Sequence, residues 1–284
     1  MLANEVGFYP HTPIHSLHPW IWTMGDRPIV ATAIHDGHAV RKEVAEHFAI
    51  TRRDRRREED PFTAQWTHIA QTRLIVLRSR FEVDLNRPRQ QAIYRHPQDA
   101  WGLHVWKKPL SEAAIARSLA QYDAFYAELA QVCRSLEQQF GRFVILDLHT
   151  YNHCREGQIA SVKDNPEINL GTQTLDRSYW SLILDRISRD LQQFDFLGRK
   201  LDVRENVKFM GGHMAQWIHQ HFPGSACVVS IEVKKFFMNE WTNEPDVRQL
   251  NAVYQALHST VPGILDALQQ MSLRDPIKCY ERKF

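Results

Sequence analysis

Four short apolar segments, rich in β-branched residues, constrain the fold of this chain more than any other feature of its sequence. Each is apolar throughout rather than alternating with polar residues, which is typical of strands buried on both faces of a parallel sheet. Longer segments with helical periodicity separate them, so helices are expected to cover both faces of the sheet. The sequence therefore predicts a single three-layer α/β/α domain over residues 1–284, with a mixed, mainly parallel sheet and with residues 1–27 packed on it as an N-terminal extension. The predicted strands are 28–34, 73–77, 143–148 and 226–233, and the predicted helices are 39–48, 62–71, 112–140, 177–193, 214–221 and 246–271.

The charge of the chain argues against nucleic acid as a partner. Lys and Arg total 35 against 33 Asp and Glu, and the formal net charge of +2 gives no field strong enough to attract a polyanion. The Arg-rich segment 52–60 ends in acidic residues, and we interpret it as a solvated helix–loop face.

Other bulk features indicate a soluble, cytoplasmic protein with no membrane partner. No apolar run approaches the roughly 20 residues that a membrane-spanning helix needs, and the N-terminus lacks the pattern of a secretory signal. The 4 Cys form no CxxC pair, which excludes a cysteine-based zinc knuckle. The 15 His indicate metal or proton chemistry, although histidines scattered over the surface would give the same count.

Polar residues follow the predicted strands at the point where each one ends. His35 follows the first strand, Arg80 the second, Asp147 and His149 the third, and Glu232 lies near the end of the fourth. Because ligands of open α/β sheets bind beyond the carboxyl ends of the strands, these side chains are expected at one rim.

The two strand-end histidines predict a metal centre. A catalytic zinc takes three protein ligands from His, Asp or Glu and leaves one position open, and His35 and His149 can supply two of them. Asp147 lies on the same face of its strand as His149 and could orient a ligand or bind substrate. The alternative is that the histidines only cap a helix or hydrogen-bond inside a polar core. The third ligand stays open between His38, which follows closely, and Asp60 with its neighbours Glu58 and Glu59.

Two further features fit hydrolysis beside such a metal. Glu232 interrupts an apolar strand, where a carboxylate is costly unless it is paired or functional, and it could act as a general acid and base. The alternative is an ion pair with Lys234 or with an Arg across the sheet. Segment 79–88 (SRFEVDLNRP) is dense in anion-binding groups, since Arg offers a planar fork to a carboxylate, although a surface loop with ordinary ion pairs would have the same composition.

Taken in order, the segments HDGH, SRFEVDLNRPR, DLHTY, NLGT and IEV resemble the N-formylglutamate amidohydrolase family. The resemblance covers about residues 30 to 240, and the DLNR and DLH segments are also similar to the wider zinc carboxypeptidase and aspartoacylase group. It implies a phosphorylase/hydrolase-like fold and a zinc ion, or another divalent transition metal, as the cofactor. The resemblance implies His35 and His149 as metal ligands, with Asp60 as a candidate third ligand. It implies that Arg80, Asn86 and Arg87 bind substrate carboxylates and that Gly171 and Thr172 line the pocket. Glu232 would be the general acid and base.

One departure from the family pattern concerns the ligands. The PHSG-like segment of the family is IHDGH here, so His38 stands where the carboxypeptidase group carries a glutamate. The third ligand therefore stays open, and the acyl group need not be formyl.

The function that the sequence predicts is hydrolysis of the amide bond of a small N-acyl acidic amino acid by a protein that could form a homo-oligomer. The alternatives are a zinc exopeptidase or γ-glutamyl hydrolase, and a non-catalytic protein that binds a metal or an acidic ligand. An RNA-contacting module built on the Arg run is a weaker alternative.

Overall fold

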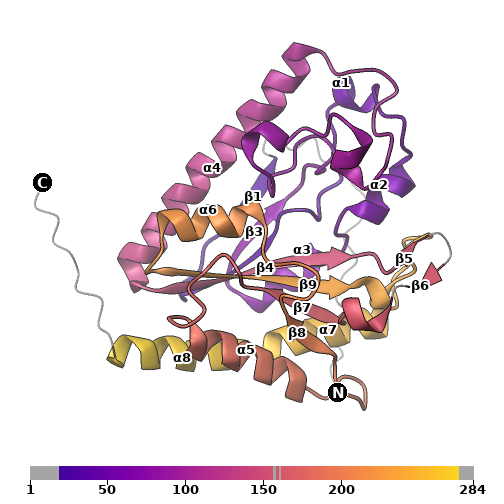
Figure 1. The fold of residues 1–284 in the computed structure, drawn as a ribbon. Helices are drawn as coiled ribbons and strands as arrows, with labels where there is room; N and C mark the ends of the chain where they lie inside the picture. Colours follow the sequence, from indigo (N-terminus) through magenta and orange to yellow (C-terminus); the bar gives the residue numbers. More distant parts are fainter. Residues whose placement is uncertain (1–18, 156–157, 160, 275–284) are drawn as a thin grey trace, which may run out of the picture.

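A seven-stranded sheet forms the centre of the computed structural model, which describes residues 19–155, 158–159 and 161–274 (Figure 1). The strand order is β1-β3-β2-β4-β9-β7-β8. The strands are β1 (Trp20–Thr23), β2 (Ile29–Ala33), β3 (Thr72–Val76), β4 (Phe143–Tyr151), β7 (Ile168–Gly171), β8 (Val203–Glu205) and β9 (Ala226–Lys234), and a separate hairpin pairs β5 (Cys154–Arg155) with β6 (Gln158–Ile159).

The sheet is mixed and mainly parallel, as the sequence predicts. Strands β3, β2, β4 and β9 are parallel neighbours, whereas β1 is antiparallel to β3, and β7 is antiparallel to β9 but parallel to β8. The pairing of β4 with β9 runs over nine residues and sets His149 beside Glu232. Parallel pairing from β3 to β9 brings the carboxyl ends of these strands to one edge.

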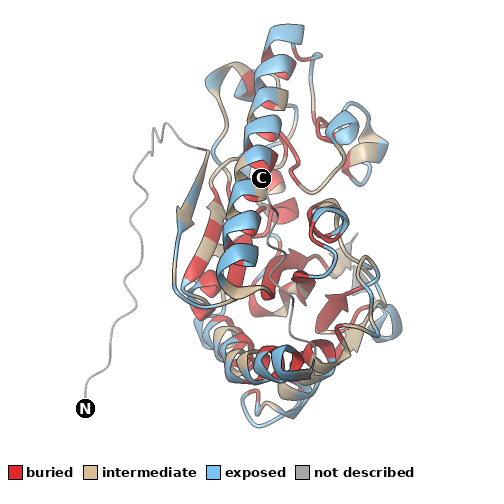
Figure 2. Cartoon of the chain, turned by 90° about the vertical axis from the view of Figure 1, so that its left-hand side faces the viewer, coloured by how far each residue is buried: buried red, intermediate tan, exposed pale blue. Residues whose placement is uncertain are grey.

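Helices lie on both faces of the sheet and give the predicted three layers (Figure 1). The long α4 and α6 lie over one face, and α5, α7 and α8 lie over the other. Figure 2 shows that α4 turns an exposed side outward and a buried side inward. The α-helices are α1 (Lys42–Ala45), α2 (Arg52–Glu58), α3 (Thr63–Trp66), α4 (Glu112–Phe140), α5 (Ser181–Gln193), α6 (His213–His221), α7 (Val247–Ser259) and α8 (Val261–Arg274), and short 3-10 helices cover Thr67–Ile69, Arg89–Gln91, Pro97–Ala100, Val162–Asp164 and Lys235–Phe237.

Two apolar cores result, one on each face. Phe143 and Ile145 of β4 belong to the core under α4 and α6, whereas Leu146 and Leu148 belong to the core under α5, α7 and α8. Successive side chains of a strand point to opposite faces, so a strand covered on both sides is apolar at most positions. The exceptions in β2 and β4 are Thr32, Asp147, His149 and Thr150.

The predicted helix 112–140 has the bounds of α4. Ser111 accepts a hydrogen bond from the N–H of Ala114 at the start, and Gly141, with φ of 71°, ends the helix. Both residues are standard caps. The four predicted strands and the helices 177–193 and 214–221 are found with shifted bounds. Helix 39–48 is reduced to α1, and helix 62–71 is α3 followed by a 3-10 helix.

Two predictions are wrong. Segment 246–271 is not one helix, because α7 ends before Thr260 and α8 carries Pro262, which has no N–H to continue the preceding helix. The segment 52–60 is not a solvated face, because Arg55, Arg57 and Glu58 on α2 are buried. The sequence patterns also missed β1, β7 and β8, which are only three or four residues long.

The N-terminal extension predicted over residues 1–27 lies largely outside the described residues, which begin at residue 19; within it, β1 is an edge strand of the sheet. Cys133, Cys154 and Cys227 carry free thiols, and Cys279 lies outside the described part of the chain. In the described part, no helix combines the length and apolarity that crossing a bilayer requires.

Strand β7 pairs only with residues 230–233 of β9, so among the described residues the first residues of β9 have no neighbouring strand on that side. A buried histidine, His219, accepts a backbone hydrogen bond there instead. The N–H of Val228 donates to Nε2 of His219 on α6 at 2.9 Å, so Nδ1 must carry the proton and donate to Thr174 Oγ1 at 2.9 Å. Protonation of Nε2 would break the first of these bonds. Burial lowers the pKa of His219 from its ordinary 6.5 to about 4.

We expect His219 to make the free energy of unfolding depend on pH. Between about pH 6.5 and 4 the unfolded chain binds a proton that the folded chain excludes, so stability falls as pH falls through this window, by on the order of 3 kcal/mol in full. The substitution His219→Gln keeps an acceptor and a donor without a titrating group. Urea unfolding of the two proteins at several pH values should give a shallower loss for the variant, and equal slopes would contradict this role.

Candidate metal centre and substrate anchors

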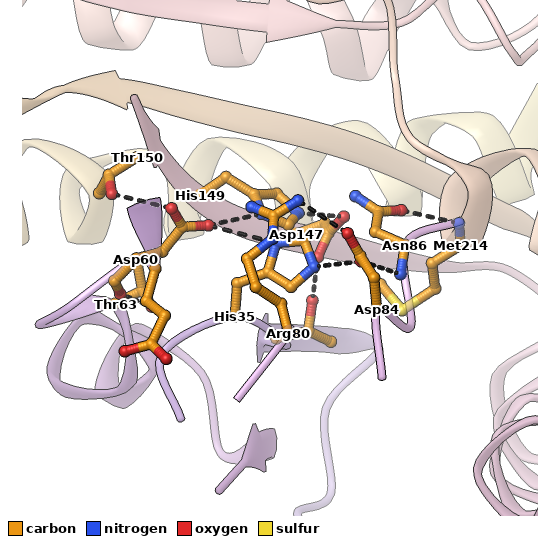
Figure 3. Close-up of polar contacts among 12 residues, drawn as sticks. His35, Asp60, Thr63, Arg80, Asp84, Asn86, Asp147, His149, Thr150 and Met214 are labelled. Carbon is orange, nitrogen blue, oxygen red and sulfur yellow. Dashed lines mark hydrogen bonds and ion pairs between the residues drawn. The ribbon is translucent and has the colours of Figure 1, made fainter. Parts of the chain in front are cut away.

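Three buried side chains converge at the carboxyl edge of the sheet (Figure 3). His35 follows β2, His149 lies near the end of the neighbouring β4, and Asp60 follows α2. Asp60 Oδ2 lies 3.0 Å from His149 Nδ1 and 3.4 Å from His35 Nδ1, and one ligand atom of each residue lies within 4.8 Å of the others. The side chains are only 2–3% exposed.

Backbone contacts explain how Asp60 reaches the two histidines. Its N–H donates to the carbonyl oxygen of His35 at 3.0 Å, which fixes the turn after α2 against the end of β2. Thr63 Oγ1 donates to the carbonyl oxygen of Asp60, and Thr150 Oγ1 donates to Asp60 Oδ1 at 3.1 Å. Asp60 is therefore held by the chain segments that carry both histidines.

A second carboxylate orients each imidazole. Asp84 Oδ1 lies 2.8 Å from His35 Nε2, and Asp147 Oδ2 lies 2.9 Å from His149 Nε2. Since an ionised carboxylate only accepts, each Nε2 carries a hydrogen, and Nδ1 is the ring nitrogen that faces Asp60. Without an ion, Nδ1 of His149 donates to Asp60; a metal bound between them would take the place of that proton. Thr32 Oγ1 donates to Asp147 Oδ1 at 2.7 Å from the adjacent strand. The sequence suggested that Asp147 could orient a ligand, and its contact with His149 Nε2 is the contact that this role requires.

Electrostatic coupling within this group is strong. Burial would lower the pKa of His149, but Asp147 and Asp60 outweigh it and raise this pKa well above 6.5. Burial would likewise raise the pKa of Asp60, but its contacts with His149 and His35 lower this pKa below its ordinary 3.8. The site therefore attracts positive charge into its centre.

The arrangement fits a divalent transition metal. His35 Nδ1 is buried and makes no hydrogen bond of good geometry within the described chain, although it faces Asp60. A buried polar atom without a partner is costly, and a cation between the two Nδ1 atoms and Asp60 would satisfy it. Two imidazoles and one carboxylate, with outer carboxylates on the far ring nitrogens, are a donor set suited to zinc.

Among the candidates for the third ligand, the structure brings Asp60 to the two histidines and places the others elsewhere. His38 is outside the group, and burial together with Arg56 lowers its pKa to about 4. Glu59 accepts a hydrogen bond from Ser79, and Glu58 pairs with Arg57.

Glu232 lies beside His149 on the adjacent strand. Burial raises its pKa to about 7, and the positive charge of His149 opposes this shift. Lys234, the partner considered in the alternative interpretation, donates instead to the carbonyl oxygen of Asn165 at 3.0 Å. The carboxyl group thus lies next to the candidate metal ligands, with a pKa that suits proton transfer near neutral pH.

Both predicted carboxylate-binding arginines connect to the candidate metal ligand His35 through Asp84. Arg80 Nη2 lies 2.9 Å from Asp84 Oδ2, and Arg87 Nε lies 3.6 Å from the same oxygen. Tyr94 joins them, because its hydroxyl donates to Asp84, accepts from Arg80 Nε at 3.0 Å, and its ring lies 5.0 Å from the Arg87 guanidinium. Arg87 retains 28% side-chain exposure against 13% for Arg80.

Asn86, Gly171 and Thr172 have mainly structural contacts. Asn86 Oδ1 accepts from the N–H of Met214 in the first turn of α6 at 3.0 Å. A Cβ on Gly171 would lie 2.7 Å from the backbone nitrogen of Gly211, and the N–H of Thr172 donates to Asn206. Their predicted contacts with substrate stay predictions.

Two cavities lie near the sheet but not at the three residues. One, an open hollow of about 640 Å³, lies at the amino end of β3 and is lined by Gly25, His68 and Arg73. The other, of about 130 Å³, lies next to Tyr94 and His104.

Sequence reasoning missed Asp84, Tyr94, Thr32 and Thr150 as parts of this site. A signal existed for Thr32, a hydroxyl inside the buried strand β2 and directly opposite Asp147 in register. Asp84 and Tyr94 reach the site through the irregular segment between β3 and α4, whose path no periodic pattern predicts.

Comparisons with known proteins agree with this fold. A family model described as N-formylglutamate amidohydrolase matches residues 27–238. The N-formylglutamate amidohydrolase of Ralstonia eutropha JMP134 superposes with a TM-score of 0.71 at 19% identity, covering 89% of this chain and 99% of that one. A gene product of Agrobacterium tumefaciens gives a TM-score of 0.62 at 16% identity, with 89% and 96% covered. No curated protein matched.

The fold and the site define an α/β protein with a His/Asp/His group at the carboxyl edge of a mainly parallel sheet. With a family model matching most of its length, the chain belongs to the N-formylglutamate amidohydrolase family. The sequence resemblance is thereby confirmed.

We expect the substitution Asp147→Asn to weaken binding of Zn²⁺ roughly 10- to 100-fold, because the carboxylate that fixes the His149 ring and raises its basicity is lost. Competition with a chromophoric chelator measures the dissociation constant. Asp176→Asn, at an exposed carboxylate that accepts from Ser178, is the matched control and should bind as the wild type does. Equal affinities for the two variants would contradict the orienting role.

Proposed function

We propose that this protein is a metal-dependent amidohydrolase that cleaves the amide bond of an N-acyl, formyl-like derivative of an acidic amino acid. The observation that carries the proposal is the chain of contacts from the His35, Asp60 and His149 group through Asp84 to Arg80 and Arg87. It joins a candidate metal centre to cationic groups suited to a carboxylate. Membership of the family and the likeness to the Ralstonia eutropha enzyme support the same substrate class.

His35 Nδ1, His149 Nδ1 and Asp60 Oδ2 would hold the metal, for which zinc is the first candidate. A divalent cation bound there would polarise the amide carbonyl and make a water molecule more acidic. Asp84 and Asp147 keep the two rings in the tautomer and orientation that this binding needs.

Glu232 would handle the protons of the reaction. As a carboxylate it accepts a proton from the attacking water, and as an acid it returns that proton to the nitrogen of the departing amino acid. A pKa of about 7 suits a group that must do both near neutral pH. Its place beside His149 on the adjoining strand puts it next to the metal ligands.

Arg87 is the better candidate for the substrate carboxylate. Its guanidinium is more exposed than that of Arg80, whose Nε and Nη2 already contact Tyr94 and Asp84. The main role of Arg80 would then be to hold Asp84, and through it His35, in place. Contact with the substrate would fall to Arg87.

A substrate panel separates this proposal from its alternatives. Release of the acyl group from N-formyl-glutamate or related N-acyl acidic amino acids supports it, whereas cleavage of glutamyl peptides alone would favour an exopeptidase or γ-glutamyl hydrolase. Metal bound at one ion per chain without hydrolysis of any of these compounds would favour a non-catalytic binding protein.

The substitution Glu232→Gln should lower kcat on the best N-acyl amino acid by roughly 10²- to 10⁴-fold, because the amide cannot accept the proton of the attacking water. The metal content should stay near that of the wild type, since Glu232 is not one of the three ligands. Glu244→Gln, at an exposed turn residue, serves as the control. Full activity of the Glu232 variant would refute the assigned role.

For Arg87→Met we expect KM to rise roughly 10- to 100-fold with little change in kcat, which corresponds to the loss of one charge-assisted hydrogen bond to the substrate carboxylate. Arg89→Met is the matched control, because Arg89 is exposed and pairs with Asp123 away from the site. Steady-state kinetics of the two variants decide the question, and an unchanged KM for Arg87→Met would remove this residue from the binding site.

A further inference from the structure

Lys235 is a fully buried lysine directly after β9, with 1% of its surface exposed. Its ammonium group donates to two backbone carbonyl oxygens, that of Arg57 at 2.5 Å and that of Glu59 at 2.8 Å. Burying an ammonium group is costly, so a structure that retains one must gain from the contacts it makes.

Both carbonyl oxygens lie at the C-terminal end of α2, immediately before Asp60. The last carbonyl groups of a helix have no partners within the helix, and a cationic side chain is a favourable cap for them. Here the capping residue is distant in sequence, since Lys235 lies 178 positions after Arg57 and 176 after Glu59. Its hydrogen bonds therefore fix the position of the end of α2 relative to β9. The carboxylate of Asp60 is presented by the turn that this cap stabilises.

The turn is held from two directions. Lys235 binds the carbonyl oxygens at the end of α2, and the N–H of Asp60 donates to the carbonyl oxygen of His35. Removing the first restraint leaves the second, together with the hydrogen bonds from Thr63 and Thr150, so Asp60 would remain near the histidines but would occupy a wider range of positions. Metal affinity depends on such positioning, because ligands must be held within a few tenths of an ångström of their places.

The charge of Lys235 also matters at this position. Burial lowers the pKa of Lys235 from its ordinary 10.5 to about 8, and the negative charges of Asp60, Glu58 and Glu240 oppose this shift. The ammonium form therefore still predominates at neutral pH. A cation here balances part of the negative charge that gathers around the candidate metal centre.

We propose that Lys235 is a positioning residue for the candidate metal centre, which holds the Asp60 turn by capping α2 and thereby sets metal affinity. This inference rests on the proposed function, because it requires that His35, Asp60 and His149 bind a metal.

The test compares Lys235→Met, Lys235→Gln and the matched control Lys234→Met. The neighbouring Lys234 also donates to a backbone carbonyl oxygen, that of Asn165, but not at the end of α2. Titration of each metal-free, full-length protein with Zn²⁺ against a chromophoric chelator gives the dissociation constant. Hydrogen exchange of the Asp60 amide in the same proteins reports on the turn without any metal.

We expect Lys235→Met to bind Zn²⁺ at least about tenfold more weakly than the wild type, which is the usual effect of losing an outer partner of a metal ligand. The Gln variant, which keeps an amide donor, should lie between them, and Lys234→Met should bind as the wild type does. Exchange of the Asp60 amide should be faster in the Lys235 variants only. A merely structural role would lower the melting temperature without this selective change.

Wild-type affinity in folded Lys235→Met would overturn the inference, as would an equal loss in Lys234→Met. If circular dichroism shows that the Met variant is unfolded, Lys235→Gln decides, and unchanged affinity there overturns it. Absence of Zn²⁺ binding by the wild type would instead refute the proposed metal centre, and this inference with it.

Discussion

The parallel pairing of β2 with β4 is the constraint on which the rest of this structure depends. It brings His35 and His149 to one edge with their ring centroids 5.0 Å apart, in a place that water hardly reaches. Imidazoles and carboxylates are tolerated in such a place only when they are paired or bind a cation. The position of Asp60 between the two Nδ1 atoms, with a carboxylate behind each ring, satisfies this demand and defines the site.

The side chains beyond this group link the two arginines proposed for substrate recognition to the candidate metal ligands. Asp84 contacts His35 on one side and Arg80 on the other, and Tyr94 binds both Asp84 and Arg80. A substrate carboxylate bound by Arg87 would therefore lie close to the candidate metal ligands, because Asp84 contacts both Arg87 and His35. This arrangement suits an amide bond located next to an acidic group, which is the substrate class proposed here.

Much of the fold follows from local sequence patterns. Continuous apolar runs predict the central strands, and Ser111 and Gly141 define the ends of α4. His35 and His149 could be predicted as neighbours because parallel strands end at one edge of a sheet. Asp60 could not be distinguished from His38 or Glu59, because it reaches the site through a turn fixed by His35 and Lys235, which are distant in sequence. For the same reason the Arg-rich segment 52–60 looks solvated in the sequence and is largely buried in the fold.

The central claim is that two Nδ1 atoms and one Asp60 oxygen bind a single divalent metal ion. The most direct measurement is a crystal structure of the protein, purified without chelator and supplied with Zn²⁺, with anomalous diffraction data on both sides of the zinc absorption edge. The account predicts one strong anomalous peak between His35, Asp60 and His149. A map with no peak there, in which the three side chains contact one another as they do without an ion, would contradict it.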